Sequence, residues 1–156
     1  MAELTGGAQV FHANTSTVDT AVQVTVGTRS RDAAGNEYIY LKGVAATGAG
    51  SWVTYNLNTG TTAVLTANAV GPVAIAMAAV VADRWGWYQI FGKNTIASTD
   101  TIAANLQLYI DGSDGRADDA DVAGDAIIGA TSLTADTSNV ATVMLTYPYT
   151  SNVAID

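Results

Sequence analysis

The sequence predicts an all-β protein: a β-sandwich or β-barrel of about eight to ten short strands, preceded by an extended N-terminal arm. Short segments alternate large or apolar residues with small or polar ones at a period of two, as strands do. Gly, Asn and Asp turns separate these segments at short intervals. The β-branched residues Thr, Val and Ile make up nearly a third of the 156 residues, and no segment shows a capped amphipathic helix.

The chain divides into an arm and one domain. Residues 1–17 are small and polar, with Val10 and Phe11 as a strong apolar pair, and we expect an extended arm that makes its contacts only after assembly. Residues 18–156 contain no linker and no internal repeat, so we expect a single β domain.

The first half of the domain alternates clearly. Val18 to Val26 place Val or Thr at every second position and predict the first strand. Residues 29–36 end in Gly-Asn and predict a turn. Tyr38–Lys42 and Trp52–Leu57 predict the next two strands, and a turn follows at Asn58-Thr59-Gly60.

The Ala-rich segment Val73–Val81 is also predicted as a strand. Its large residues Val73 and Ile75 alternate with small Ala, whereas a helix would group large residues three and four apart. A helix stays open as the alternative because Ala and Met tolerate it. Asp83-Arg84-Trp85-Gly86 then predicts a turn, and Trp87–Phe91 predicts the returning strand of a hairpin.

Three strands are expected in the last third of the chain. Leu106–Ile110 alternates and ends in Asp-Gly, and Ala126–Ala130 is a short apolar run. Ala141–Tyr147 is the last clear strand, and we expect Pro148 to stop it, because proline lacks the N–H that a strand ladder needs.

Composition removes most functional chemistry. The chain has 14 acidic and 6 basic residues, a net charge of −8, one histidine (His12) and no cysteine. Nucleic-acid binding needs clustered Lys and Arg, so we expect no nucleic-acid partner. The histidine lies in the arm, where nothing holds its imidazole as a catalytic triad would. We therefore expect no enzymatic activity, no metal and no cofactor.

Targeting features are also lacking in the sequence. The start has neither the basic region nor the apolar region of a secretory signal. The most apolar stretch, Ala69–Ala82, is shorter than the roughly 20 residues of a membrane span and contains Gly71 and Pro72. We expect no membrane partner, and synthesis in a reducing cytoplasm fits the lack of cysteine.

The segment 111–125 is an acidic loop. Aligning Gly115 with the glycine of an EF-hand leaves Ile110 and Gly112 where oxygen ligands belong and Asp121 in place of the bidentate Glu. We therefore expect a solvated surface turn, extended because its carboxylates repel one another. A weak calcium site is the alternative.

The densest aromatic point is Asp83–Tyr88. Tryptophan and arginine are enriched at protein interfaces, whereas the same side chains also serve as ordinary strand and core residues or as a platform for sugars. The candidate interface residues are Val10, Phe11, Trp52, Arg84, Trp85 and Trp87.

The order of several segments resembles small structural proteins of tailed phages. In those proteins a "VG-A" strand runs into a "YGWVQ–G" return, and here Trp85 replaces the Tyr and Tyr88 replaces the Val. The resemblance covers roughly residues 38–148. The segments that carry it are Val70–Ala76, Trp85–Gly92, Gly115–Asp118, Ile127–Ala130 and Val143–Pro148.

The family that this pattern resembles is that of capsid decoration, or cement, proteins. Membership would imply a virion protein on the outer capsid surface that binds the major capsid protein and braces the head. It would also imply a homotrimer whose N-terminal arm reaches a neighbouring subunit, and it transfers no individual functional residue. The alternative is a carbohydrate-binding or tail-associated adhesion module that uses calcium at the acidic loop and stacks sugars on Trp85 and Trp87.

Overall fold

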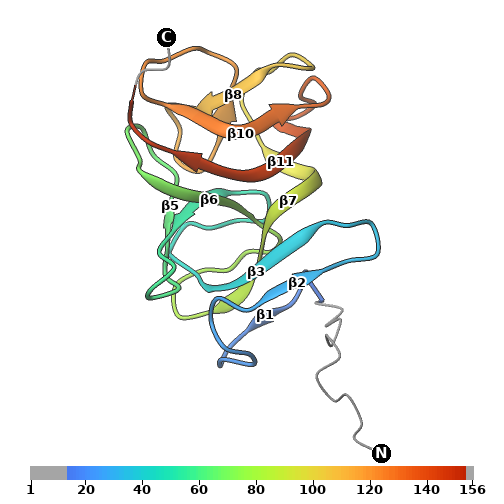
Figure 1. Cartoon of the computed structure of the whole chain (residues 1–156), viewed down its shortest axis with the longest axis vertical. Coiled ribbons are helices and arrows are strands. Elements are labelled where there is room, and N and C mark those ends of the chain that lie inside the picture. The colour runs from blue at the N-terminus through green and yellow to red at the C-terminus, as the bar shows by residue number, and fades with distance from the viewer. Residues whose placement is uncertain (1–13, 154–156) are drawn as a thin grey trace, which may run out of the picture.

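A computed structural model describes residues 14–153 and confirms the predicted all-β class. Eleven strands belong to one hydrogen-bonded sheet in which all strand pairs are antiparallel (Figure 1). In chain order the strands are β1 (Val18–Asp19), β2 (Arg29–Arg31), β3 (Glu37–Lys42), β4 (Trp52–Tyr55), β5 (Thr62–Val64), β6 (Gly71–Ala76), β7 (Trp85–Ser98), β8 (Gln107–Ile110), β9 (Ala117–Asp118), β10 (Ala126–Ser132) and β11 (Val140–Thr150).

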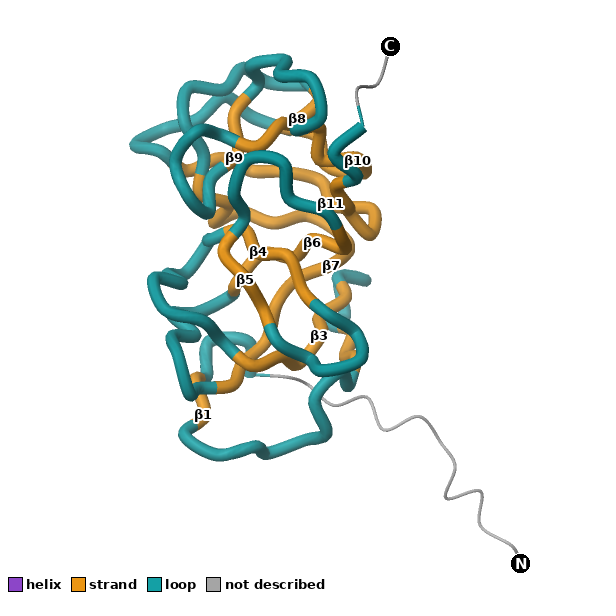
Figure 2. The backbone as a smooth tube through the Cα atoms, turned by 90° about the vertical axis from the view of Figure 1, so that its left-hand side faces the viewer, coloured by secondary structure: helices purple, strands orange, loops and turns teal. Residues whose placement is uncertain are grey.

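The sheet curls into two lobes that share β6 and β7 (Figures 1 and 2). In the lower lobe β3, β7, β6, β4 and β5 follow one another, and a parallel bridge between Lys42 and Thr61 joins the two ends. In the upper lobe β7, β11, β10, β8 and β9 follow one another, and a bridge between Thr99 and Ala117 closes the ring. The long strand β7 therefore belongs to both rings.

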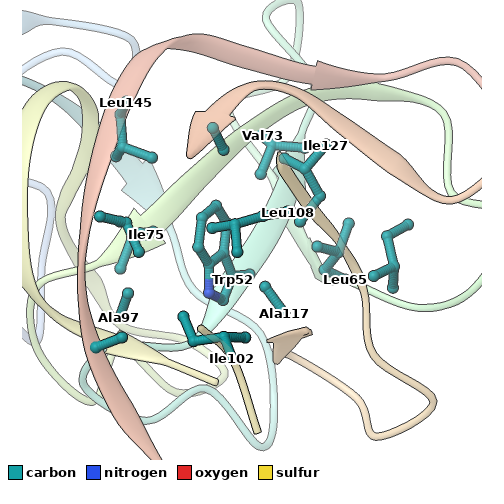
Figure 3. Close-up of a cluster of buried hydrophobic side chains, with 14 residues drawn as sticks. Trp52, Leu65, Val73, Ile75, Ala97, Ile102, Leu108, Ala117, Ile127 and Leu145 are labelled. Atoms are coloured by element: carbon teal, nitrogen blue, oxygen red, sulfur yellow. The ribbon is translucent and has the colours of Figure 1, made fainter. Parts of the chain in front are cut away.

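Each lobe encloses its own apolar core, and β6 forms part of the wall between them. Val73 and Ile75 of β6 point into the upper core with Trp52 (Figure 3), whereas Ala74 and Ala76 belong to the lower core. The predicted alternation of large and small residues is thus confirmed, and its cause is that both faces of β6 are buried. The strand ends at Ala76, earlier than the expected Val81.

The predicted strand from Val18 to Val26 is wrong except at its start. Only Val18 and Asp19 pair, with Gly86 and Trp85 of β7, and the chain then leaves the sheet. Val24 and Val26 instead pack as a loop on the outer face of β3 and β7. Val18, Val24 and Val26 are partly buried, whereas Thr20 and Val22 at the same spacing are exposed, so the alternation indicated neither a partner strand nor one continuous covered face.

Two predicted strand ends are also wrong. Strand β7 continues past Phe91 because it pairs with β11 from Phe91 to Ser98. At Gly92, whose φ is +95°, the side-chain Oδ1 of Asn36 accepts a hydrogen bond from the Lys93 N–H. Strand β11 continues past Pro148 because its pairing with β10 shifts register just there, so the missing proline N–H interrupts no ladder.

The predicted turns at 29–36 and 83–86 are shorter than expected. Arg29–Arg31 forms strand β2, which leaves the turn to the following residues up to Asn36. Trp85 and Gly86 already belong to β7. None of the residues from 14 to 153 forms a helix of the length and apolarity that a membrane crossing requires.

Gly50 lies where the two lobes meet, and its substitution tests this arrangement. Its N–H donates to the Ala76 carbonyl and its own carbonyl accepts from Ser98. An added Cβ would lie 2.0 Å from the Ile96 carbonyl oxygen, whereas nothing lies within 4 Å at Gly35, which has nearly the same φ.

We expect Gly35→Ala to cost about 1–2 kcal/mol, because only the left-handed backbone is strained. Gly50→Ala is expected to cost clearly more, because its backbone contact has to move as well. Urea denaturation of the two variants measures the difference. Equal losses would contradict the close approach of β4 to β7.

Candidate functional site

Two of the predicted interface residues are core residues instead. Trp52 is fully buried in the upper core, and its Nε1 donates to the Ser98 carbonyl oxygen at 2.9 Å. Trp87 is 7% exposed and packs edge to face against Tyr40, with ring centroids 5.2 Å apart. The prediction is corrected for both residues, because side chains this deeply buried offer little surface to a partner.

Arg84 and Trp85 are partly exposed and form one candidate binding surface at the start of β7. The Lys42 Nζ lies 5.7 Å from the Trp85 ring centroid and 3.2 Å from the Asp83 Oδ1. Arg84 donates from Nη1 to the Asp83 carbonyl oxygen. The remaining predicted residues, Val10 and Phe11, lie outside the described residues.

A second surface, which the sequence did not predict, gathers around Tyr147. The Tyr147 hydroxyl donates to the Glu37 Oε2, and its ring lies against Phe91 with centroids 5.0 Å apart. The Arg31 Nη2 donates to the same Glu37 oxygen at 2.6 Å. The Arg29 guanidinium carbon lies 6.0 Å from the Tyr147 ring centroid. We call these five residues the tyrosine–arginine patch.

Strand register brings the patch together. Arg31 pairs with Glu37 across the β2–β3 hairpin, and Glu37 pairs with Phe91 of β7. Residues opposite each other in a sheet share a face, so these side chains stand in one row. Tyr147 reaches the row from β11 because its backbone adopts a left-handed φ of +51° next to the register shift.

The electrostatics of the patch depend on one nearly buried carboxylate. The Glu37 side chain is 11% exposed, whereas that of Arg31 is 63% exposed. The Tyr147 hydroxyl and then Arg31 stabilise the charged carboxylate and lower the pKa of Glu37, although burial opposes them. The same contacts raise the pKa of Arg31 and of Tyr147. The patch thus holds two exposed guanidinium groups against one carboxylate.

Two hollows lie on the surface beside the patch. One, of about 420 Å³, is lined by β4, β5 and β6 and includes Tyr55, whose side chain feels the charge of Arg29. Leu57 and Val70 at its edge are 63% and 68% exposed. The other hollow, of about 630 Å³, is lined by Phe91 itself, with further apolar and polar residues of β3, β7 and β11. Only the second hollow shares a residue, Phe91, with the patch.

The acidic loop is built into the fold at its centre. The Gly115 N–H donates to the Leu65 carbonyl, its carbonyl accepts from the Trp52 N–H, and Ala117 is fully buried in β9. The predicted extended turn is therefore wrong there, because backbone contacts with β4 and β5 outweigh the repulsion. Asp114 and Asp121 are exposed as expected.

Hydrogen bonds offset the negative charge of only some carboxylates in the acidic loop. Burial, and then the charges of Asp111, Asp119 and Asp100, raise the pKa of Asp118, although the Ala120 N–H opposes the shift. Asp125 is 5% exposed and accepts from the Asn68 N–H at 2.6 Å. Within residues 14–153 no three His, Asp or Glu side chains are grouped so that they could hold a metal ion.

The patch could have been suspected from two signals in the sequence. Arg29 and Arg31 hold two of the six basic residues within three positions. Tyr147 and Tyr149 flank a proline in a strand that has no other aromatic residue. Neither signal says that the two segments, more than a hundred positions apart, meet in space.

No family model, no curated protein and no solved structure matches this chain. The arrangement described above supplies binding chemistry, in the form of aromatic faces, guanidinium groups and exposed apolar side chains.

The different roles of two tryptophans can be measured by substitution. Trp52→Ala is expected to cost about 3–5 kcal/mol, because it leaves a cavity in the upper core and an unpaired Ser98 carbonyl. Trp85→Ala is expected to cost about 1 kcal/mol, as is usual for a partly exposed residue. Equilibrium unfolding in urea distinguishes the two, and a smaller loss at Trp52 than at Trp85 would contradict the assignment.

The Glu37 carboxylate predicts a specific dependence on pH. Its pKa is lowered in the folded state, so its stabilising effect is present above the unfolded pKa and is lost as the pH falls through the folded pKa. At pH 7, Glu37→Gln should therefore unfold at a lower temperature than the parent chain. The difference in unfolding temperature between the variant and the parent chain should decrease as the pH falls below about 4. A difference that stays constant from pH 7 to pH 3 would contradict this account.

Proposed function

We propose that this protein is a non-enzymatic capsid decoration protein of a tailed phage. It binds the major capsid protein on the outer surface of the head and acts there as a homotrimer. The proposal starts from the resemblance over residues 38–148. The observation that favours it most is the partly exposed aromatic site at Arg84 and Trp85, beside the point where the N-terminal segment joins the sheet.

The position of this site suits a protein that is anchored by its arm. Asp19 of β1 pairs directly with Trp85, so the described chain enters the sheet beside this site. Tryptophan and arginine are the residue types that dominate binding energy at protein interfaces. A capsid contact made jointly by the arm and by Trp85 needs no cofactor and no catalytic group.

The shared strand suits a bracing role. A load applied to the lower lobe passes directly along the backbone of β7 to β11 in the upper lobe, without crossing a linker. The alternative, a carbohydrate-binding module, would depend on Trp85 alone, because Trp87 is covered by Tyr40.

Co-sedimentation with empty capsids of the phage that encodes the chain tests this proposal. We expect the full chain to sediment with capsids and to raise the temperature at which they rupture. Trp85→Ala, and separately deletion of residues 2–13, should weaken binding by at least about tenfold, as loss of an interface hot spot does.

Leu57→Ala, at an exposed position on another surface, is the matched control and should bind normally. Failure of the full chain to sediment with capsids would overturn the proposed function. Normal binding by both Trp85→Ala and the deletion would leave capsid binding in place but remove the arm and Trp85 from its interface.

A further inference from the structure

The tyrosine–arginine patch presents positive charge on β2, the last strand in the hydrogen-bonded order among residues 14–153. Strand β2 ends the strand order, and both of its arginines are exposed. Among residues 14–153 Arg29 forms no ion pair within 4 Å, and its guanidinium lies over Tyr147. Exposed tyrosine with arginine is a composition typical of interface hot spots. A partner for this surface should therefore be acidic, with apolar groups that can cover Tyr147.

The patch is not suited to pairing with itself. A two-fold contact between two β2 edges would place Arg29 and Arg31 of one copy against the same arginines of the other, and like charges directly opposite are destabilising. A cyclic trimer, moreover, requires two different surfaces on each subunit, because only two-fold contacts are self-complementary.

The same chain carries a complementary surface. The acidic loop exposes Asp114 and Asp121, and its Val122 is 48% exposed. Burial, and after it the charges of Asp111, Asp119 and Asp100, raise the pKa of Asp118, so a cation that approaches the loop meets uncompensated negative charge. Of the four cations outside the patch, only Arg116 lies within the loop.

The two surfaces cannot meet within one molecule. Strand β2 lies in the lower lobe, whereas β8 and β9 on either side of the acidic loop's first residues lie in the upper lobe (Figures 1 and 2). The ring of strands that contains each surface is closed by its own bridge, Lys42–Thr61 in the lower lobe and Thr99–Ala117 in the upper lobe. Their charges can be matched only between copies.

We propose that this chain associates with itself head to tail, with Arg29, Arg31 and Tyr147 of one copy bound to the acidic loop of the next. The contact closes into a ring of three if the rotation between copies is 120°. The number of copies follows the proposed function, but the contact itself does not depend on a capsid.

Sedimentation of the purified chain without capsids tests the contact. At low salt we expect a concentration-dependent trimer, which weakens as the salt is raised because the matched charges are exposed. Arg29→Glu, and separately the double variant Asp114→Lys with Asp121→Lys, should each lower the association constant by at least about tenfold. Combining all three substitutions in one chain exchanges the sign of the charge at the three substituted positions and should recover part of the lost self-association.

Several outcomes would overturn the head-to-tail contact. They are a chain that stays monomeric at low salt, a trimer that the single-surface variants leave intact, and a triple variant that fails to reassociate although circular dichroism shows it folded. If Arg29→Glu unfolds the chain, Arg29→Gln replaces it, with a smaller but still measurable loss expected.

Capsid binding separates this inference from the proposed function. A monomeric chain that binds capsids through the patch, and loses that binding in Arg29→Glu, would overturn self-association while leaving decoration intact. A trimer that binds no capsid would overturn the proposed decoration function while leaving self-association intact.

Discussion

The architecture depends on the hydrogen bonding of one strand. Along its 14 residues β7 pairs with β1, β3, β6 and β11, so two rings of strands are built on a common backbone. A register shift between Gln89 and Phe91, opposite Tyr38 and Glu37, lies just where the strand begins to pair with β11. This shift fixes the row in which Glu37 and Phe91 stand, and Tyr147 can reach that row only because β11 follows the second half of β7. The fold and the tyrosine–arginine patch thus share one cause.

Much of the fold follows from local pattern. Period-two alternation identified β3, β6 and most of β11, because each has at least one face fully buried. The same rule failed at Val18–Val26, where side chains of a loop cover Tyr40 and Trp87 and so imitate a strand. Val24 and Val26 are partly buried there without a hydrogen-bonded neighbour, and Val22 is exposed, so alternation by itself did not identify a strand. The extent of β7 and β11 depended on partner strands and register shifts, which are set by segments far away in the sequence.

The functional surfaces were predictable in composition and unpredictable in place. Aromatic density drew attention to Trp85, which is partly exposed, whereas Trp52, also predicted as an interface residue, is buried by strands from the second half of the chain. Tyr147 escaped notice because its contacts with Glu37 and Arg29 span more than a hundred residues. A single sequence carries no information on such distant pairs. The residues that form the patch could therefore be identified only once the register of the strands was known.

The division into two cores also bears on the order in which the protein is made. Every residue of the lower core lies between Val18 and Ile90, whereas the upper core is incomplete until Leu145. During synthesis the lower ring can therefore close while the ribosome is still adding the second half of the chain. The second half of β7, together with Trp52, must wait for β11 to arrive. A nascent chain stalled after β7 would accordingly have a closed lower ring of strands, while the apolar residues of the upper core would still be exposed.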